Sequence, residues 1–270
     1  ALQLFHITGD NSFVDRVYPD LSRYAEYFER DRDREDMHLY DILDQGETGQ
    51  EYSSRYLFAD ASADDWRQIH LKGVDATVYI YVLQKSLSQM AALLGKSDEA
   101  KVWSRKASDT RTAILTYMWD PETKFFYDVD PRTKRRSPYK SAVGFYPFMT
   151  DIPGTEHLAA LTEHLFNPDE FGTRYPVPSS SQDDPNFSAE GDWMGKRMSC
   201  PWNGRTWPMT NSHIAEALAQ TANRLGPEWK PAAAEFILKH VKLMFFDGDV
   251  ERPNTFEHYN PFTGAPCAYR

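Results

Sequence analysis

The chain has 270 residues, of which 41% are hydrophobic and 14% aromatic, and its formal net charge at pH 7 is −10. This composition predicts a globular chain with a large core and excludes intrinsic disorder. The negative charge argues against a nucleic-acid partner, because proteins that bind phosphate backbones need a basic face. We also expect no membrane partner, since no apolar run approaches the roughly 20 residues of a spanning helix.

The first elements are expected to be helices, followed by one long loop. The chain starts at Ala1 without an initiator Met and looks helical almost at once, so we expect a processed or excised fragment. From Asn11 to about Arg30, apolar residues recur every three or four positions, which predicts a helix. Residues 39–43 have the composition of a short strand. Residues 44–56 are rich in glycine, carboxylates and aromatics, and loops of this length inside compact domains are usually functional.

The middle of the chain predicts an antiparallel helical hairpin. Apolar positions from Ile80 to Leu94 form one stripe that Gly95 closes, and Ser97 is expected to cap a second helix that reaches Met118. The very short link makes the two helices antiparallel neighbours. A short strand is expected over residues 124–129.

The last part of the chain is expected to alternate helices with long loops. Helices are predicted over residues 155–166, from Pro208 to Leu225, and for about fifteen residues from Lys230. The Pro-, Ser-, Asp- and Gly-rich residues 167–196 predict a loop. Helix, short link, helix and long loop recur, which is typical of an α/α toroid. If the long loops gather at one end, they bring together residues 44–56, 202–211 and 255–260.

One stretch, residues 199–211, combines two tryptophans, two prolines, an arginine and two asparagines just before a helix. Indole faces stack on the C–H faces of sugar rings, and Arg205, Asn203 and Asn211 offer groups that fix hydroxyls or a carboxylate. The alternative is a structural turn in which Trp202 and Trp207 only fill space. These residues alone leave both interpretations open.

Four segments resemble motifs of six-hairpin glycosidases, in the order of those families. Residues Gly49–Tyr56 resemble the acid-bearing loop of trehalases, and Val74–Asp75 resembles a helix start in the same clan. Residues Trp202–Pro208 are similar to a Trp-x-Gly-x-x-Trp tract of processing α-glucosidases and mannosylglycerate hydrolases. Residues Phe256–Gly264 are similar to the segment that carries the catalytic base there. Glu51 stands where trehalases have Asp, which preserves a carboxylate.

The resemblance implies an all-α chain with the (α/α)6 six-hairpin toroid. Roughly seven of twelve helices are recognisable, so residues 1–270 would form a single partial catalytic domain, the central to C-terminal part of a barrel. The missing remainder of that barrel would then be its structural partner. Neither a cofactor nor a metal is implied. The acidic pairs Asp64-Asp65 and Asp183-Asp184 are expected to be solvated rather than to bind calcium.

The activity implied by the resemblance is hydrolysis of an α-linked sugar by an exo-acting, inverting glycosidase. Glu51 would be the general acid and Glu257 the general base, with the carboxyl groups roughly 6.5–9.5 Å apart. Asp44 and Glu47 are possible neighbours of the acid. The expected substrate-binding residues are Tyr52, Arg55, Asp75, Trp202, Asn203, Arg205, Trp207 and Asn211.

Other interpretations of these residues are simpler. Glu51 could pair with Arg55 one helical turn away, Glu257 could cap a turn, and Asp75 could be an ordinary helix N-cap. The alternative function is a non-catalytic, carbohydrate-binding fragment of an α/α toroid. A structural α/α domain without a ligand is a third option.

Overall fold

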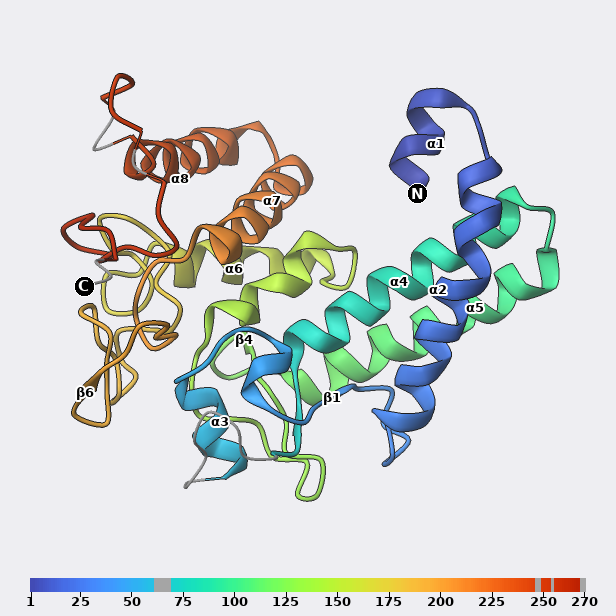
Figure 1. Cartoon of the computed structure of the whole chain (residues 1–270), viewed down its shortest axis with the longest axis horizontal. Helices are drawn as coiled ribbons and strands as arrows, with labels where there is room; N and C mark the ends of the chain where they lie inside the picture. Colours follow the sequence, from blue (N-terminus) through green and yellow to red (C-terminus); the bar gives the residue numbers. More distant parts are fainter. Residues whose placement is uncertain (61–68, 246–248, 254, 268–270) are drawn as a thin grey trace.

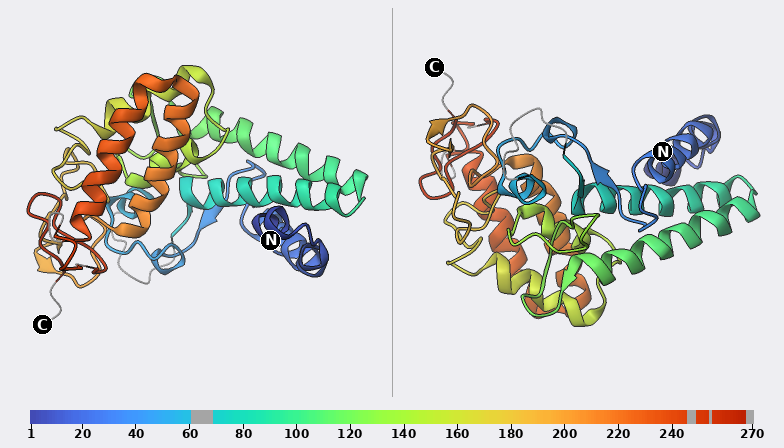
Figure 2. Two further views of the ribbon diagram at one scale, coloured as in Figure 1. Left: turned by 90° about the horizontal axis from the view of Figure 1, so that it is seen from above. Right: turned by 90° about the horizontal axis from the view of Figure 1, so that it is seen from below.

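The computed structural model describes residues 1–60, 69–245, 249–253 and 255–267, and most of its regular structure is helical (Figure 1). The strands among these residues occur only as three two-stranded antiparallel sheets. The helices form an open, curved arrangement, and the described residues do not close into a ring (Figures 1 and 2). None of the described helices combines the length and the apolar character needed to cross a membrane.

Three long helices pack side by side at the end of the molecule where the chain starts. Helix α1 (Leu2–Thr8) leads into α2 (Ser12–Asp31), which lies on α4 (Val74–Leu93). Helix α5 (Ser97–Ala113) returns antiparallel along α4. A separate small core joins the three helices through Tyr18, Leu87 and Trp103. The predictions of a helix from Asn11 and of a helical hairpin are therefore confirmed.

The hairpin differs from the prediction at its ends. Gly95 adopts the left-handed conformation with φ of 74° just after α4, as expected for a helix C-terminus. The expected cap is wrong, because Ser97 is already helical and Lys96 occupies the N-cap position without a side-chain hydrogen bond. After Ala113 the chain continues as a π-helical turn, η2 (Ile114–Met118).

Short strands and 3-10 turns connect the helices. Strand β1 (Asp41–Ile42) pairs with β2 (Leu71–Lys72), and β3 (Trp119–Asp120) pairs with β4 (Phe125–Phe126). The two strands expected at residues 39–43 and 124–129 are thus present but only two residues long. The expected loop at residues 44–56 contains the 3-10 turn η1 (Gln45–Glu47), and helix α3 (Ser54–Ala59) begins inside it.

The main core lies around a buried 3-10 helix that sequence analysis missed. Helix η3 (Ala142–Met149) contains Pro147, and all its residues except Met149 are buried. It packs against α4 and against α7 (Pro208–Leu225), beside α6 (Leu158–Leu165) with its preceding turn η4 (Thr155–His157). A segment covered on all sides has no polar face, so neither helical nor strand periodicity marks it.

Helices and loops of the last hundred residues follow the prediction closely. Helix α7 begins at Pro208 and ends at Leu225, and α8 (Lys230–Leu243) follows the turn η5 (Pro227–Trp229). Between residues 167 and 196 the only strands are β5 (Asp192–Trp193) and the first residue of β6 (Lys196–Arg197), which pair with each other. Thr206 forms bridges to Pro178 and Tyr259, so two of the loops expected to gather, residues 202–211 and 255–260, meet here together with the loop that contains Pro178.

Candidate active site

The loop that carries Glu51 is held in place by backbone contacts. Asp44 caps η1 by accepting a hydrogen bond from the backbone N–H of Glu47, at 3.1 Å. The Gln45 side chain accepts one from the backbone N–H of Tyr52, at 2.8 Å, where Tyr52 adopts a positive φ of 59°. The carbonyl of Glu51 accepts the backbone N–H of Trp202, at 3.0 Å. The half-buried Glu51 therefore lies directly beside residues 199–211.

Four residues C-terminal to Glu51, Arg55 lies at the centre of a buried charge cluster. Its guanidinium donates two hydrogen bonds of 2.7 Å to Asp128, two of 2.9 and 3.0 Å to Asp75, and one of 3.2 Å to Gln50. All five N–H donors of an arginine are thus directed at protein groups. The alternative in which Arg55 serves mainly as the ionic partner of Glu51 does not fit this geometry. Its predicted place in a sugar subsite stays a prediction, and the geometry favours a supporting role.

Burial and charge oppose each other in this cluster. Burial acts to lower the pKa of Arg55, but the charges of Asp128 and Asp75 outweigh it and hold the pKa well above its usual value. Burial raises the pKa of Asp128, although the Arg55 charge counteracts the rise. Asp128 also accepts the N–H of Val74 at 2.9 Å, so the cluster fixes the start of α4. Asp75 is not the N-cap, which is Gly73, but it lies in the first turn.

The two predicted sugar-stacking tryptophans are buried against each other. The rings of Trp202 and Trp207 stack with centroids 4.0 Å apart and planes inclined by 10°, and each side chain is 4% exposed. The indole N–H of Trp207 donates to the carbonyl of Pro201, at 3.1 Å. The ring of Trp207 also lies 4.6 Å from that of His258. This geometry matches the space-filling alternative, and the stacking of either ring on a sugar stays a prediction.

The remaining predicted binding residues of this stretch hold neighbouring loops. Asn203 donates to the carbonyls of Asn186 and Asp192, both at 2.8 Å, and Asn211 donates to the carbonyls of Val177 and Trp207. Both asparagines are buried. Their role in binding a ligand stays a prediction, while their role in closing these loops is direct.

Arg205 is buried and fixes the protonation of a histidine. It donates through Nε to Nδ1 of His258 at 3.0 Å and through Nη1 to the carbonyl of Ala189 at 3.0 Å. Because Nδ1 accepts, the proton of the neutral imidazole sits on Nε2, which donates to the carbonyl of Ser199 at 3.0 Å. Burial lowers the pKa of His258, and the neighbouring Arg205 charge adds to this effect.

Cys200 links the surroundings of both predicted catalytic carboxylates. Its Sγ lies 3.3 Å from Oε2 of Glu51, to which the thiol donates a hydrogen bond. Burial raises the pKa of the thiol to about 12, and the negative charges of Glu51 and Glu257 contribute to the rise. Glu257 itself is exposed at the surface, next to the buried His258. The segments of Glu51 and Glu257 therefore meet at residues 199–202.

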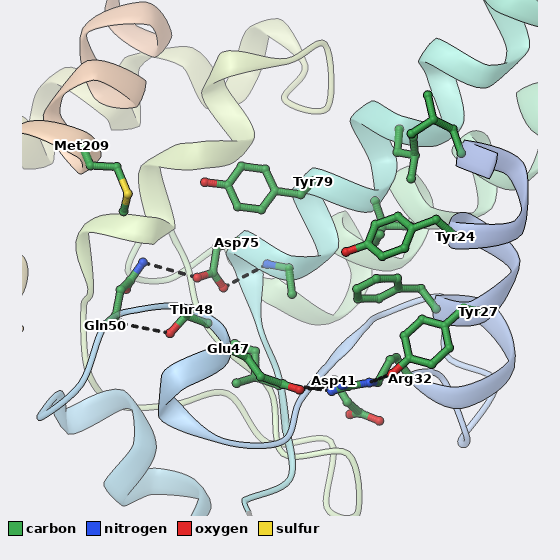
Figure 3. A pocket seen from close by; sticks show the side chains of 16 residues that line it. Tyr24, Tyr27, Arg32, Asp41, Glu47, Thr48, Gln50, Asp75, Tyr79 and Met209 are labelled. Carbon is green, nitrogen blue, oxygen red and sulfur yellow. Dashed lines mark hydrogen bonds and ion pairs between the residues drawn. The ribbon is translucent and has the colours of Figure 1, made fainter. Parts of the chain in front are cut away.

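A cavity of about 700 Å³ borders the Glu51 loop (Figure 3). One wall consists of aromatic rings from α2 and α4, those of Tyr24, Tyr27, Phe28 and Tyr79. The polar groups on its other side include Gln50 and Asp75, and Gln50 directly precedes Glu51. Sequence analysis missed the rings of α2, because their helical spacing placed them in an apolar stripe. Tyr24 is 54% exposed, so part of that stripe faces the cavity instead of the core.

The described residues contain two groups of side chains close enough to bind a metal ion. They are Asp33, Asp36 and His38, and Glu35, Asp41 and His70. In the second group the buried Lys72 already supplies a cation, with Nζ 2.8 Å from Glu35 and 3.1 Å from Asp41.

The two carboxylates of the described acidic pair have different partners. Asp183 pairs with Lys140 at 2.8 Å, and Asp184 accepts from Ser54 at 2.9 Å. Asp64 and Asp65 lie outside the described residues. Asp183 is exposed, but Asp184 is buried, so the expectation that this pair is solvated is wrong for Asp184.

Comparisons with known structures confirm the fold class. The chain superimposes on a sialidase with a TM-score of 0.79 and 20% identity, over 95% of this chain and 22% of that one. The mannosylglycerate hydrolase of glycoside hydrolase family 63 from Thermus thermophilus, in complex with glucose, gives a TM-score of 0.73 and 20% identity, over 94% of this chain and 64% of that one. Likeness at this identity shows the fold, and it agrees with part of a six-hairpin toroid.

Sequence comparison identifies the family. An uncharacterized protein of Borreliella burgdorferi is 25% identical over 190 residues, which cover 70% of this chain and 37% of that protein. The chain thus spans little more than a third of this relative. The family model of the mannosylglycerate hydrolase MGH1-like glycoside hydrolase domain matches residues 1–270. The chain therefore belongs to the mannosylglycerate hydrolase MGH1-like glycoside hydrolase family.

Proposed function

We propose that this chain carries the catalytic carboxylates of an exo-acting glycoside hydrolase that cleaves an α-linked sugar with inversion. Glu51 is the general acid that protonates the leaving oxygen, and Glu257 is the general base that activates water on the opposite face of the sugar ring. The observation that carries the proposal is that residues 199–202 contact both segments. Trp202 and Cys200 bind Glu51, while Ser199 binds the histidine next to Glu257.

The cavity beside Gln50 is the proposed place for a sugar unit of the substrate. Its aromatic wall offers flat apolar faces, and its polar wall offers groups that bind hydroxyls. Tyr24 and Tyr79 are 54% and 44% exposed, so their rings are accessible to a ligand. Replacing either tyrosine by alanine is expected to raise KM more than it lowers kcat, because a ring that only holds the sugar binds ground state and transition state alike.

The first test is a panel of aryl glycosides and disaccharides in both anomeric forms. It includes mannosylglycerate, after which the related Thermus enzyme is named. Turnover is expected to fall by about 10²–10⁴-fold in Glu51→Gln and Glu257→Gln, since each removes one proton transfer. The control is Glu235→Gln, which changes an exposed carboxylate that pairs with Lys239 on α8. Circular dichroism checks that all variants keep their helicity.

The stereochemistry is tested separately. Proton NMR of the first product released from an α-linked substrate should show the β anomer, because a single displacement inverts the anomeric carbon. Release of the α anomer would refute the general-base role of Glu257. A helical wild type that binds sugars without turning them over would instead support the non-catalytic, carbohydrate-binding alternative.

A further inference from the structure

The Cys200 thiol occupies a position that the two-carboxylate mechanism does not itself require. It is half-buried between the Glu51 loop and the segment of Glu257, and its Sγ is 3.3 Å from Oε2 of Glu51. A thiol has a single proton to donate, and here that proton points at one oxygen of the carboxyl group. The other oxygen of Glu51 then remains for a substrate.

The backbone around Cys200 is fixed on both sides. The N–H of Trp202, two residues on, donates to the carbonyl of Glu51, and the carbonyl of Ser199, one residue back, accepts from His258. Trp202 is further held by its stack on Trp207. Cys200 is therefore a rigid donor, whose position relative to Glu51 does not depend on a long, flexible side chain.

The electrostatics keep this thiol in the form that can donate. Burial comes first, and the negative charges of Glu51 and Glu257 add to it, so that the pKa of Cys200 rises to about 12. The charges that act on this thiol are those of Glu51 and Glu257. Behind Ser199 lies His258, which is neutral because burial lowers its pKa, and the Arg205 charge bonded to it adds to this effect. At neutral pH the thiol therefore keeps its proton and is a poor nucleophile.

We propose that Cys200 is a positioning residue, whose S–H fixes the rotamer of Glu51 so that its second carboxyl oxygen faces the glycosidic oxygen. The proposal rests on the proposed function, because it assigns Glu51 as the acid. Geometry of this kind matters in catalysis, since small misplacements of a proton donor lower the rate strongly. In this role Cys200 acts only through its contact with Glu51.

One test is kinetic. In the full chain, Cys200→Ala should lower kcat about 5- to 10-fold with little change in KM, because one hydrogen bond of about 1 kcal/mol orients the acid only in the transition state. Cys200→Ser keeps a donor in place and should recover most of the rate. Cys267→Ser, which removes the other cysteine, is the matched control. Wild-type kcat and KM in Cys200→Ala would overturn the positioning role.

The second test needs no catalysis. In a Cys267→Ser background, alkylation of Cys200 by iodoacetamide is followed against pH, because only the thiolate reacts. Glu51→Gln removes the nearest negative charge and should speed alkylation at pH 8 by at least about tenfold, one pKa unit. Glu257→Gln should have a smaller effect. Unchanged alkylation in Glu51→Gln would overturn the contact between Cys200 and Glu51.

The two tests separate the failure of this inference from the failure of the proposed function. A wild-type chain that hydrolyses no glycoside, yet shows the alkylation shift, would refute the hydrolase and the positioning role while leaving the contact established. An active wild type with neither a kinetic nor an alkylation effect at Cys200 would refute the inference alone.

Discussion

Replacing Arg55 by methionine is expected to destabilise the fold far more than replacing one of its partners. The guanidinium is fully buried and balances two carboxylates, so the cluster of Arg55, Asp75 and Asp128 carries one net negative charge. Without the arginine, two negative charges remain buried side by side. Breaking a buried ion pair in this way costs about 3–5 kcal/mol of unfolding free energy. Methionine is chosen because it fills a similar volume without a charge.

The matched variant is Asp128→Asn, which leaves Arg55 facing one carboxylate. The amide oxygen of the new side chain still accepts a hydrogen bond, from Arg55 or from the N–H of Val74. We expect a smaller loss of about 1.5–3 kcal/mol, the range of one hydrogen bond to a charged group. Urea unfolding followed by circular dichroism measures both variants at pH 7.

The pH dependence gives a second, independent check on Arg55→Met. Burial already raises the pKa of Asp128, and removal of the arginine takes away the charge that counteracts the rise. A carboxyl with a raised folded-state pKa stabilises the fold below its unfolded-state pKa, and this contribution is lost as pH rises through the folded-state pKa. The difference in unfolding free energy between wild type and Arg55→Met should therefore be smaller at pH 5 than at pH 7. A gap that is constant with pH, or a variant as stable as Asp128→Asn, would refute this reasoning.

Three further changes test the supports of the site. Gly204→Ala should lower the free energy of unfolding, measured in urea, by about 1–3 kcal/mol, because φ is 145° and an added Cβ would lie 2.8 Å from the Ser188 carbonyl oxygen. The control Gly9→Ala places its Cβ in open space and should lower this free energy less. Asn211→Ala should lower the free energy of unfolding by about 2–3 kcal/mol, because it leaves buried backbone groups of the loop at Val177 unpaired. The control Asn223→Ala, on the exposed face of the same helix, should change it by less than about 0.5 kcal/mol. The third change is His258→Asn. Burial lowers the pKa of the wild-type imidazole, so the unfolding free energy of the wild type should fall as pH drops below about 6.5, and the fall should be shallower in the variant by up to about 1.4 kcal/mol per pH unit. Equal slopes of unfolding free energy against pH, from pH 7 to pH 5, would contradict the assignment.

The sequence predicted those helices whose burial is one-sided. The predicted start and end of α7 agree with the structure, because Pro208 suits a first helical turn and Gly226 suits the position after the last. Helix η3 was missed because it is buried on nearly all sides and carries Pro147. The π-helical end of the hairpin, residues 114–118, was also missed, since an extra residue in one turn leaves the apolar spacing nearly unchanged.

The candidate site was predicted as a set of positions, but not as a set of contacts. The resemblance to six-hairpin glycosidases located Glu51 and Glu257 from short motifs. Nothing in those motifs indicated that Arg55 would bind Asp128, which lies 73 residues further along the chain. Such pairs depend on how the start of α3 and the chain just after β4 approach each other. Periodicity within one element contains no information about that approach.

The contacts of residues 199–211 change what this stretch is expected to do. Its mixture of indoles, amides and a guanidinium first suggested direct binding of a sugar. In the structure Asn203, Arg205 and Asn211 direct their donors at backbone carbonyls and at His258, and the two indoles cover each other.

The contacts of Arg205 show most clearly how this stretch holds the neighbouring loops in place. Burial lowers its pKa, and its hydrogen-bond acceptors are an imidazole nitrogen and the carbonyls of Ala189 and Ala265 instead of a carboxylate. A buried cation held only by neutral acceptors keeps a positive field in the loops around it. Burial lowers the pKa of His258 and the Arg205 charge adds to this effect, so the residue next to Glu257 is a neutral imidazole. Residues 199–211 thus hold together the segments of Glu51 and Glu257, and under the proposed function the accessible rings of α2 and α4 are the groups that would face a sugar.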